Sequence, residues 1–216
     1  MDMNVLVEGL ISYIFLVIII TFHECGHAWM SARCGDDTAR LLGRVTLNPI
    51  AHMDIIGTVI LPLLVVFLGA SGSGLGRFII GWGKPVPVNI FRLRRPHVDD
   101  LLVAMAGPAM NVVVAFVALG LARLGVVLEV GMLKDIGFQL ALLSMYLCFF
   151  NLIPVPPLDG SYLLKHLTGM SHEAYARFSQ FGFFIVIVII QFKEVQRLLR
   201  GATLESLELL AWMWRF

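Results

Sequence analysis

Three ionisable side chains interrupt an apolar stretch near the start of the chain, where "TFHECGHAWM" contains His23, Glu24 and His27. Residues four apart project from one face of a helix, so the two imidazoles can bind one ion. This spacing is typical of zinc sites in which the glutamate polarises a water on the metal. The alternative is that neighbouring helices satisfy both histidines. An ionisable group near a bilayer centre costs at least about 2.5–3.5 kcal/mol, which favours the metal site.

Two histidines do not complete a catalytic zinc site, which usually has three protein ligands and a water. Asp159 is the favoured third ligand because it lies in "NLIPVPPLDGSYLL", where prolines and a glycine must break a helix. Broken backbone at membrane depth is tolerated only where it lines a cavity or is packed in protein, so this carboxylate can face a polar site. Its alternative role is to cap a helix that begins at Gly160. The other candidates are His52, Asp54, His97, Asp99, Asp100, His166 and His172.

The segments that carry these residues are apolar enough to lie in a membrane. Hydrophobic residues make up 58% of the 216 residues and charged ones 14%, against about 25% charged in an ordinary soluble domain. The mean hydropathy is +0.85. We therefore expect an all-α polytopic membrane protein with short β-like loops near the site. A crossing helix needs about 20 apolar residues, so the second and fifth of the five expected segments are marginal. These segments are residues 9–32, 55–70, 101–127, 133–155 and 178–192.

The chain as a whole, residues 1–216, is predicted to be a single membrane-embedded domain. Residues 193–216 are amphipathic, and their tryptophans favour a helix at the membrane interface, with a cytosolic packing helix as the alternative. The net charge of +1 provides no basic surplus for a nucleic-acid partner. Three scattered cysteines are too few for a disulfide framework, so we expect all of them to be free. The first apolar segment lacks a positive flank and is expected to be retained.

The two halves of the candidate site constrain the topology. His27 lies near the C-terminal end of the first expected helix and Asp159 just beyond the C-terminal end of the fourth, so these helices must run in the same direction. We therefore predict that residues 55–70 and their glycine-rich return are re-entrant, with no net crossing. The basic residues of 33–53 and 71–99 then lie together on the cytoplasmic side.

Three motifs in order make the chain resemble the site-2 protease family of intramembrane zinc metalloproteases. They are "HECGH" at 23–27, "AGPAMN" at 106–111 and "NLIPVPPLDG" at 151–160. The stretch "GRVTLNPIAHMDIIGTVILP", followed by "GWGKPVPVN", resembles a short subgroup without PDZ or CBS domains. Ile55 departs from that pattern, in which proline is expected, and this affects the local turn.

The resemblance implies that His23, His27 and Asp159 bind one zinc ion and that Glu24 is the catalytic acid and base. It also implies that Asn111 lies near the site and that Asn151, with the proline run, helps to present the substrate. His52 and Asp54 are separately expected to fix the turn before residue 55 or to hold the ligand histidines, with a second metal site as the alternative.

The implied activity is hydrolysis of peptide bonds within or beside transmembrane segments of protein substrates in the lipid bilayer. The implied location is a prokaryotic plasma membrane, with the active site nearer the cytoplasmic side. The "GWGKPVPVN" stretch could hold the substrate by strand addition or be only a surface connector. The rival functions are a membrane metal transporter and a non-proteolytic, partner-binding relative. Glu24 directly behind His23 favours hydrolysis, and the sequence does not indicate an oligomeric state.

Overall fold

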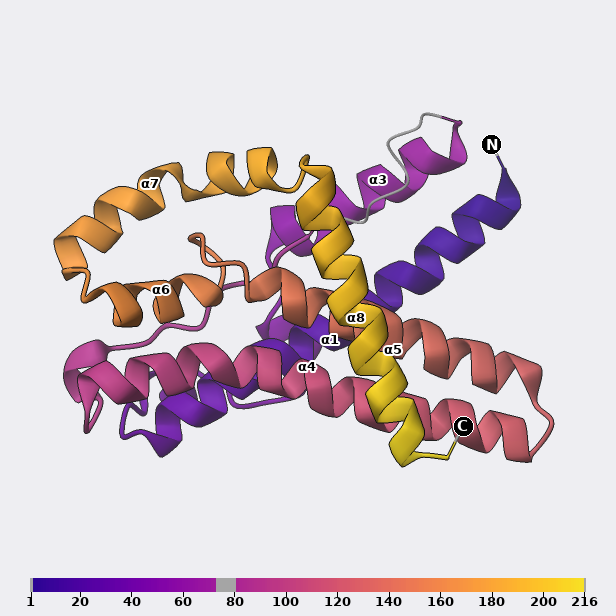
Figure 1. Cartoon of the computed structure of the whole chain (residues 1–216), viewed down its shortest axis with the longest axis horizontal. Helices are drawn as coiled ribbons and strands as arrows, with labels where there is room; N and C mark the ends of the chain where they lie inside the picture. The colour runs from indigo at the N-terminus through magenta and orange to yellow at the C-terminus, as the bar shows by residue number, and fades with distance from the viewer. Residues whose placement is uncertain (1, 73–80, 216) are drawn as a thin grey trace.

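The computed structural model describes residues 2–72 and 81–215. Within these ranges the chain is helical, and in place of strands it has one isolated antiparallel bridge between Met53 and Gly83. The predicted all-α class is therefore confirmed. In chain order (Figure 1) the elements are α1 Met3–Arg33, α2 Thr38–Leu41, η1 Pro49–Ala51, η2 Ile55–Ile60, α3 Leu61–Ala70, η4 Ile90–Arg92, α4 Pro96–Val127, α5 Gly131–Asn151, α6 Gly160–Thr168, α7 His172–Ile189 and α8 Lys193–Met213.

Three of these helices, α1, α4 and α5, are long and apolar enough to cross a membrane. Helices α7 and α8 are long and apolar enough only when they are taken together, and they meet at a bend of 85°. The segment Ile55–Ala70 is shorter and consists of the π-helical η2 followed by α3. The described residues thus contain three helices with the length and composition to cross a membrane, or four if the bent pair is one span, as in an integral membrane protein.

The core of the helix bundle is made of small residues on α4 and α5. Ala115 and Ala118 of α4 pack with Ala141 and Met145 of α5. At Gly137 the α4 backbone comes so close that an added Cβ would lie 2.6 Å from the carbonyl oxygen of Ala118. Small side chains let helix backbones approach closely where lipid offers no hydrophobic driving force, so this pairing suits a membrane-embedded hairpin.

The C-terminal helix α8 crosses over α4 and α5 (Figure 1). Its Leu207 joins the core cluster of those helices, and the Trp214 indole N–H donates to the carbonyl oxygen of Phe116 at 2.9 Å. The inner face of the amphipathic tail is therefore occupied by protein, while Trp212 on its outer face is exposed. A position of this outer face at the membrane interface stays a prediction.

The direction of the helices agrees with the topology that the site requires. The contacts of α1 with α4 run from His27 and Val103 to Phe15 and Val114, so these helices are antiparallel. Helices α4 and α5 form an antiparallel hairpin (Figure 1), and α1 and α5 consequently run the same way.

The long connection between α1 and α4 begins and ends at one place, because the Arg94 amide donates to the Cys34 carbonyl at 3.0 Å. Within it, α3 runs back along α1 until the Asp2 amide donates to the Ala70 carbonyl at 2.9 Å. This path agrees with the expected re-entrant segment. Most of its glycine-rich return, residues 73–80, lies outside the described residues.

Candidate metal centre

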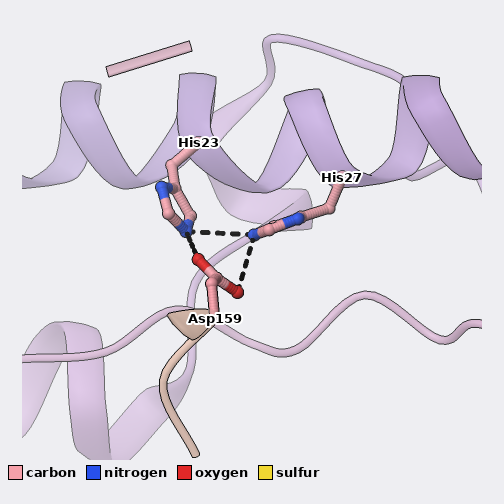
Figure 2. Close-up of side chains that lie close together, drawn as sticks. All are labelled: His23, His27 and Asp159. Carbon is pink, nitrogen blue, oxygen red and sulfur yellow. Dashed lines mark hydrogen bonds and ion pairs between the residues drawn. The ribbon is translucent and has the colours of Figure 1, made fainter. Parts of the chain in front are cut away.

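His23, His27 and Asp159 converge on one point between α1 and the start of α6 (Figure 2). The Nε2 atoms of the two histidines are 3.0 Å apart. The Asp159 carboxylate lies 3.1 Å from His23 Nε2 through Oδ2 and 3.4 Å from His27 Nε2 through Oδ1. Among the candidates for a third ligand, the structure thus brings Asp159 to the histidine pair.

The spacing of these donor atoms fits a zinc ion. In a tetrahedral site with Zn–N bonds of about 2.0–2.1 Å, neighbouring ligand atoms lie about 3.3 Å apart. The three distances between donor atoms, 3.0, 3.1 and 3.4 Å, are close to that value, with each histidine facing a different oxygen of Asp159. The Nδ1–H of His27 donates to the Val103 carbonyl at 2.7 Å, which leaves its Nε2 lone pair directed at the shared point. Two nitrogens and a carboxylate are also the donor types that zinc prefers.

Both imidazoles rest on the backbone of α4 at Gly107. A Cβ atom added there would lie 2.7 Å from His23 Cε1 and closer still to His27 Nε2. Any side chain at this position would therefore occupy the space of the ligand rings. Gly107 was not predicted to contact the histidines, and the glycine of "AGPAMN" inside a long apolar helix was the available signal for this contact.

Asp159 occupies the N-cap position of α6, but its side chain makes no capping hydrogen bond. Its carboxylate instead faces the histidines, so the capping role considered from the sequence is wrong. The irregular segment 152–159 before it packs Val155 and Leu158 against Val186 of α7. The third donor is thus delivered by the end of a broken helix, as the proline run predicted.

Glu24 follows His23 on α1 and lies beside Gly83 of the extended segment 81–89. A Cβ at Gly83 would lie 3.0 Å from Glu24 Oε1 and 2.7 Å from Ile20 Cγ2. The glutamate side chain is half-buried. Glu24 is therefore next to the ligand His23 in the sequence and lies against segment 81–89 in space.

Hydrogen bonds fix one edge of segment 81–89. The Trp82 and Lys84 amides donate to the carbonyls of Gly57 and His52 at 3.1 and 2.8 Å. The guanidinium of Arg44 donates to the Lys84 and Pro85 carbonyls. Val86 and Val88 make no backbone hydrogen bond within the described part of the chain. The expected β-like loop is thus an extended segment that is paired at Trp82 and Lys84 and has unpaired amides further along, at Val86 and Val88.

His52 and Asp54 serve the turn before η2. The buried His52 donates from Nε2 to the Thr46 carbonyl at 2.8 Å, and burial lowers its pKa, so the ring is neutral. Asp54 Oδ1 accepts from the amides of Ile56 and Gly57 at 3.0 and 2.7 Å, and so caps η2. Neither residue belongs to the ligand group of the described residues.

The two asparagines behave differently. Asn111 lies one turn after Gly107 on α4, is fully buried, and its amide has no hydrogen-bond partner within the described residues. Asn151 donates to the Leu147 carbonyl of its own helix at 3.0 Å and has no contact with the ligand group. Asn111 thus agrees with a place beside the site, whereas the proposed role of Asn151 stays a prediction.

The remaining third-ligand candidates have other positions. Asp99 accepts from the Arg95 amide at 2.8 Å and caps α4, and Asp100 pairs with Lys165 at 2.8 Å. His97 and His166 are exposed. The placement of the His172 side chain lies outside what the structure describes.

Buried polar atoms without partners gather around this centre. Such atoms are rare in folded proteins, because each leaves the cost of its desolvation uncompensated. In the described residues, they include Nδ1 of His23 and of His52, Nε of Arg44 and both amide atoms of Asn111. Arg44 and His52 are close enough to Glu24 to interact with its charge. The concentration of unsatisfied groups marks this region as a place for a polar ligand.

Comparison with known proteins gives matches that extend over most of the chain. A model described as "Peptidase family M50" matches residues 11–130 and 125–192. A Bacillus subtilis protein named "Putative zinc metalloprotease YwhC" is 33% identical over 84% of this chain and 81% of its own length. A Mycolicibacterium smegmatis protein named "Putative zinc metalloprotease Rip2" is 31% identical over 82% of this chain and 67% of its own length. No solved structure matches the chain.

Proposed function

The chain belongs to peptidase family M50, and from that membership we propose that it hydrolyses peptide bonds within or next to transmembrane segments of membrane protein substrates. The resemblance to site-2 proteases is confirmed, and the chain is a metalloprotease with apolar membrane-crossing helices. The observation that carries the proposal is the convergence of His23, His27 and Asp159 on one point, with Glu24 adjacent in sequence.

In this proposal His23, His27 and Asp159 hold one zinc ion per chain. A zinc ion bound there would lower the pKa of a water toward about 7 and polarise the scissile carbonyl. Glu24 accepts a proton from the attacking water and returns it to the nitrogen of the leaving amine. The half-buried position of Glu24 beside segment 81–89 supports this role, because the carboxylate can reach a substrate lying along that segment.

A transmembrane helix must unwind before it can be cut, because its carbonyls are engaged in its own hydrogen bonds. We propose that the substrate is held extended against segment 81–89 by strand addition. The unpaired backbone of Val86 and Val88 supports this, as does the anchoring of the residues just before them by Arg44 and His52.

We further propose a prokaryotic plasma membrane location, with the site nearer the cytoplasmic side. The relatives named above are bacterial proteins. The end of α1 and the start of α4 carry exposed arginines on the same side of the bundle, as the positive-inside tendency favours. They are Arg33, Arg92, Arg94 and Arg95.

The decisive experiment measures zinc per chain in detergent-purified protein by elemental analysis. We expect one zinc in the wild type and clear loss in Asp159→Ala. Asp54→Ala is the matched control, because it removes a carboxylate that only caps η2, and it should keep its zinc. Membrane substrates are then sought by comparing the wild type with Glu24→Gln.

Two results would contradict the proposal. Wild-type protein without zinc, even after metal is added, would lack the catalyst. Zinc flux into proteoliposomes that depends on His23, with no cleavage of membrane proteins, would favour a transporter instead. Zinc retained in Asp159→Ala would place the third ligand elsewhere, with His52 and Asp54 next to be tested.

A further inference from the structure

Helix α4 contacts both halves of the ligand set within one stretch. Val103 accepts from His27 at 2.7 Å. Asp100, one turn earlier, pairs with Lys165 Nζ at 2.8 Å, and Lys165 lies on α6, the helix that begins directly after Asp159. We propose that the Asp100–Lys165 ion pair is a positioning device that brings Asp159 to the histidines. This inference rests on the proposed function, in which Asp159 is a zinc ligand.

The pair is unusual for its burial. The Lys165 and Asp100 side chains are 12% and 13% exposed. The other pairs between lysine or arginine and aspartate in the described residues, Arg40–Asp37 and Arg95–Asp99, each have an exposed arginine. Removing two charges from water is expensive and often not repaid by their attraction. A role beyond overall stability, in which the pair defines one geometry, therefore accounts better for its presence.

The lysine is also confined by aromatic rings. Its Nζ lies 5.5 Å from the ring centre of Tyr162 and 5.3 Å from that of Tyr175. The Tyr175 hydroxyl shares a hydrogen bond of 2.7 Å with Ser161, and Ser161 donates to the Leu158 carbonyl at 2.6 Å. These contacts connect α7 with the first turn of α6 and with the residue before Asp159. Lys165 then connects this unit to α4 through its ion pair with Asp100.

The position of Asp159 is sensitive to the direction of α6. Lys165 is six residues after Asp159, about 9 Å along a helix. If α6 were not held at the lysine, a change of about 10° in its direction would displace its two ends relative to each other by roughly 1.5 Å, whereas metal–ligand distances tolerate about 0.2 Å. The apolar contacts of Leu158 and Val155 with Val186 hold the segment in place. Because such contacts are non-directional, they do not fix the orientation of α6. The ion pair between Asp100 and Lys165 fixes the orientation of α6 relative to α4.

The test is the zinc affinity of purified full-length protein, measured by competition with a chelator. We expect Lys165→Met and Asp100→Asn to weaken zinc binding by about 10- to 100-fold, the range found when residues that support metal ligands are removed. Lys165→Arg keeps the charge and should retain most of the affinity. With cobalt in place of zinc, the visible absorption spectrum of Lys165→Met should change, because the ligand geometry is altered.

Arg40→Met is the matched control, since it breaks an exposed ion pair remote from α6, and its affinity should equal that of the wild type. If the single variants do not fold, the double variant Asp100→Asn with Lys165→Met leaves no buried charge unpaired. It should fold and still bind zinc weakly.

Wild-type zinc affinity and cobalt spectrum in folded Lys165→Met, or in the double variant, would overturn the inference, even if the melting temperature fell. Absence of zinc from the wild type would instead overturn the proposed function.

Discussion

The candidate centre has two sides that are built differently. On one side, His23 and His27 lie on a continuous helix and pack on the α4 backbone at Gly107. On the other, Asp159 comes from an irregular segment before the α6–α7 hairpin (Figure 1), and α7 exposes Phe181 and Phe184 on its outer face. The first side is positioned by helix geometry and close backbone packing. The second is positioned by side-chain contacts between elements far apart in the sequence.

The largest effect is expected from closing the space under the histidines. Gly107→Ala places a methyl group where the rings lie, so the protein should lose detectable zinc binding and all cleavage. Gly201→Ala is the control, because nothing lies within 4 Å of its added Cβ, and zinc should be unaffected. Both are checked by zinc analysis. Normal zinc in Gly107→Ala would mean that the ring positions are not set by α4.

A large effect on cleavage alone is expected from the extended segment. Proline at positions 86 and 88 removes the amides of Val86 and Val88 that would bind a substrate strand, so cleavage should be abolished while zinc stays bound. The measurement is cleavage of a membrane substrate together with zinc content. Unchanged cleavage would refute strand addition and leave segment 81–89 as a connector.

Glu24→Gln separates chemistry from metal binding on the α1 side. The amide cannot take the proton of the attacking water, so cleavage should fall by about 10²- to 10⁴-fold. Zinc content should match the wild type, since Glu24 is not in the ligand group. Loss of zinc in this variant would show that Glu24 supports the ligands, and the assignment as acid and base would then fail.

The smallest effect on zinc binding is expected from shortening one of two valines, Val114 and Val186. The two are equally buried, at 8% exposure each. Val114→Ala on the α1–α4 side and Val186→Ala on the α7 side should each lower stability by roughly 1–2 kcal/mol through lost packing. We expect only Val186→Ala to weaken zinc binding, by a few-fold, because Val186 packs on the segment that delivers Asp159. Equal zinc affinities in the two variants would mean that both sides are equally rigid.

Much of this arrangement was predictable from local patterns. The four-residue spacing of His23 and His27 places both imidazoles on one helical face wherever that helix lies. The proline run before Asp159 predicted the helix break. The expected segments agree with the helices to within a few residues at most ends, although α1 and α7 each begin six residues before the expected start, and α7 meets α8 at a sharp bend.

Other features had only weak signals. Gly107 was one glycine among several in apolar helices, and nothing local indicated that two rings would rest on it. Asp100 and Lys165 are 65 residues apart, and their pairing depends on how α6 folds back onto α4. His52 and Asp54 were expected to fix the turn or to hold the ligand histidines, with a second metal site as the alternative, and their hydrogen bonds to neighbouring backbone support the turn role.

The sequence by itself determined the pair of histidines, the glutamate beside them and the apolar helices that enclose them, because each depends on residues close together in the chain. The sequence favoured Asp159 among several carboxylates, and the tertiary structure decided that it is the one beside the histidines and that the histidine rings occupy the space over Gly107. The physical reason is that the position of Asp159 depends on contacts among α4, α6 and α7, and such contacts leave no periodic pattern in the sequence.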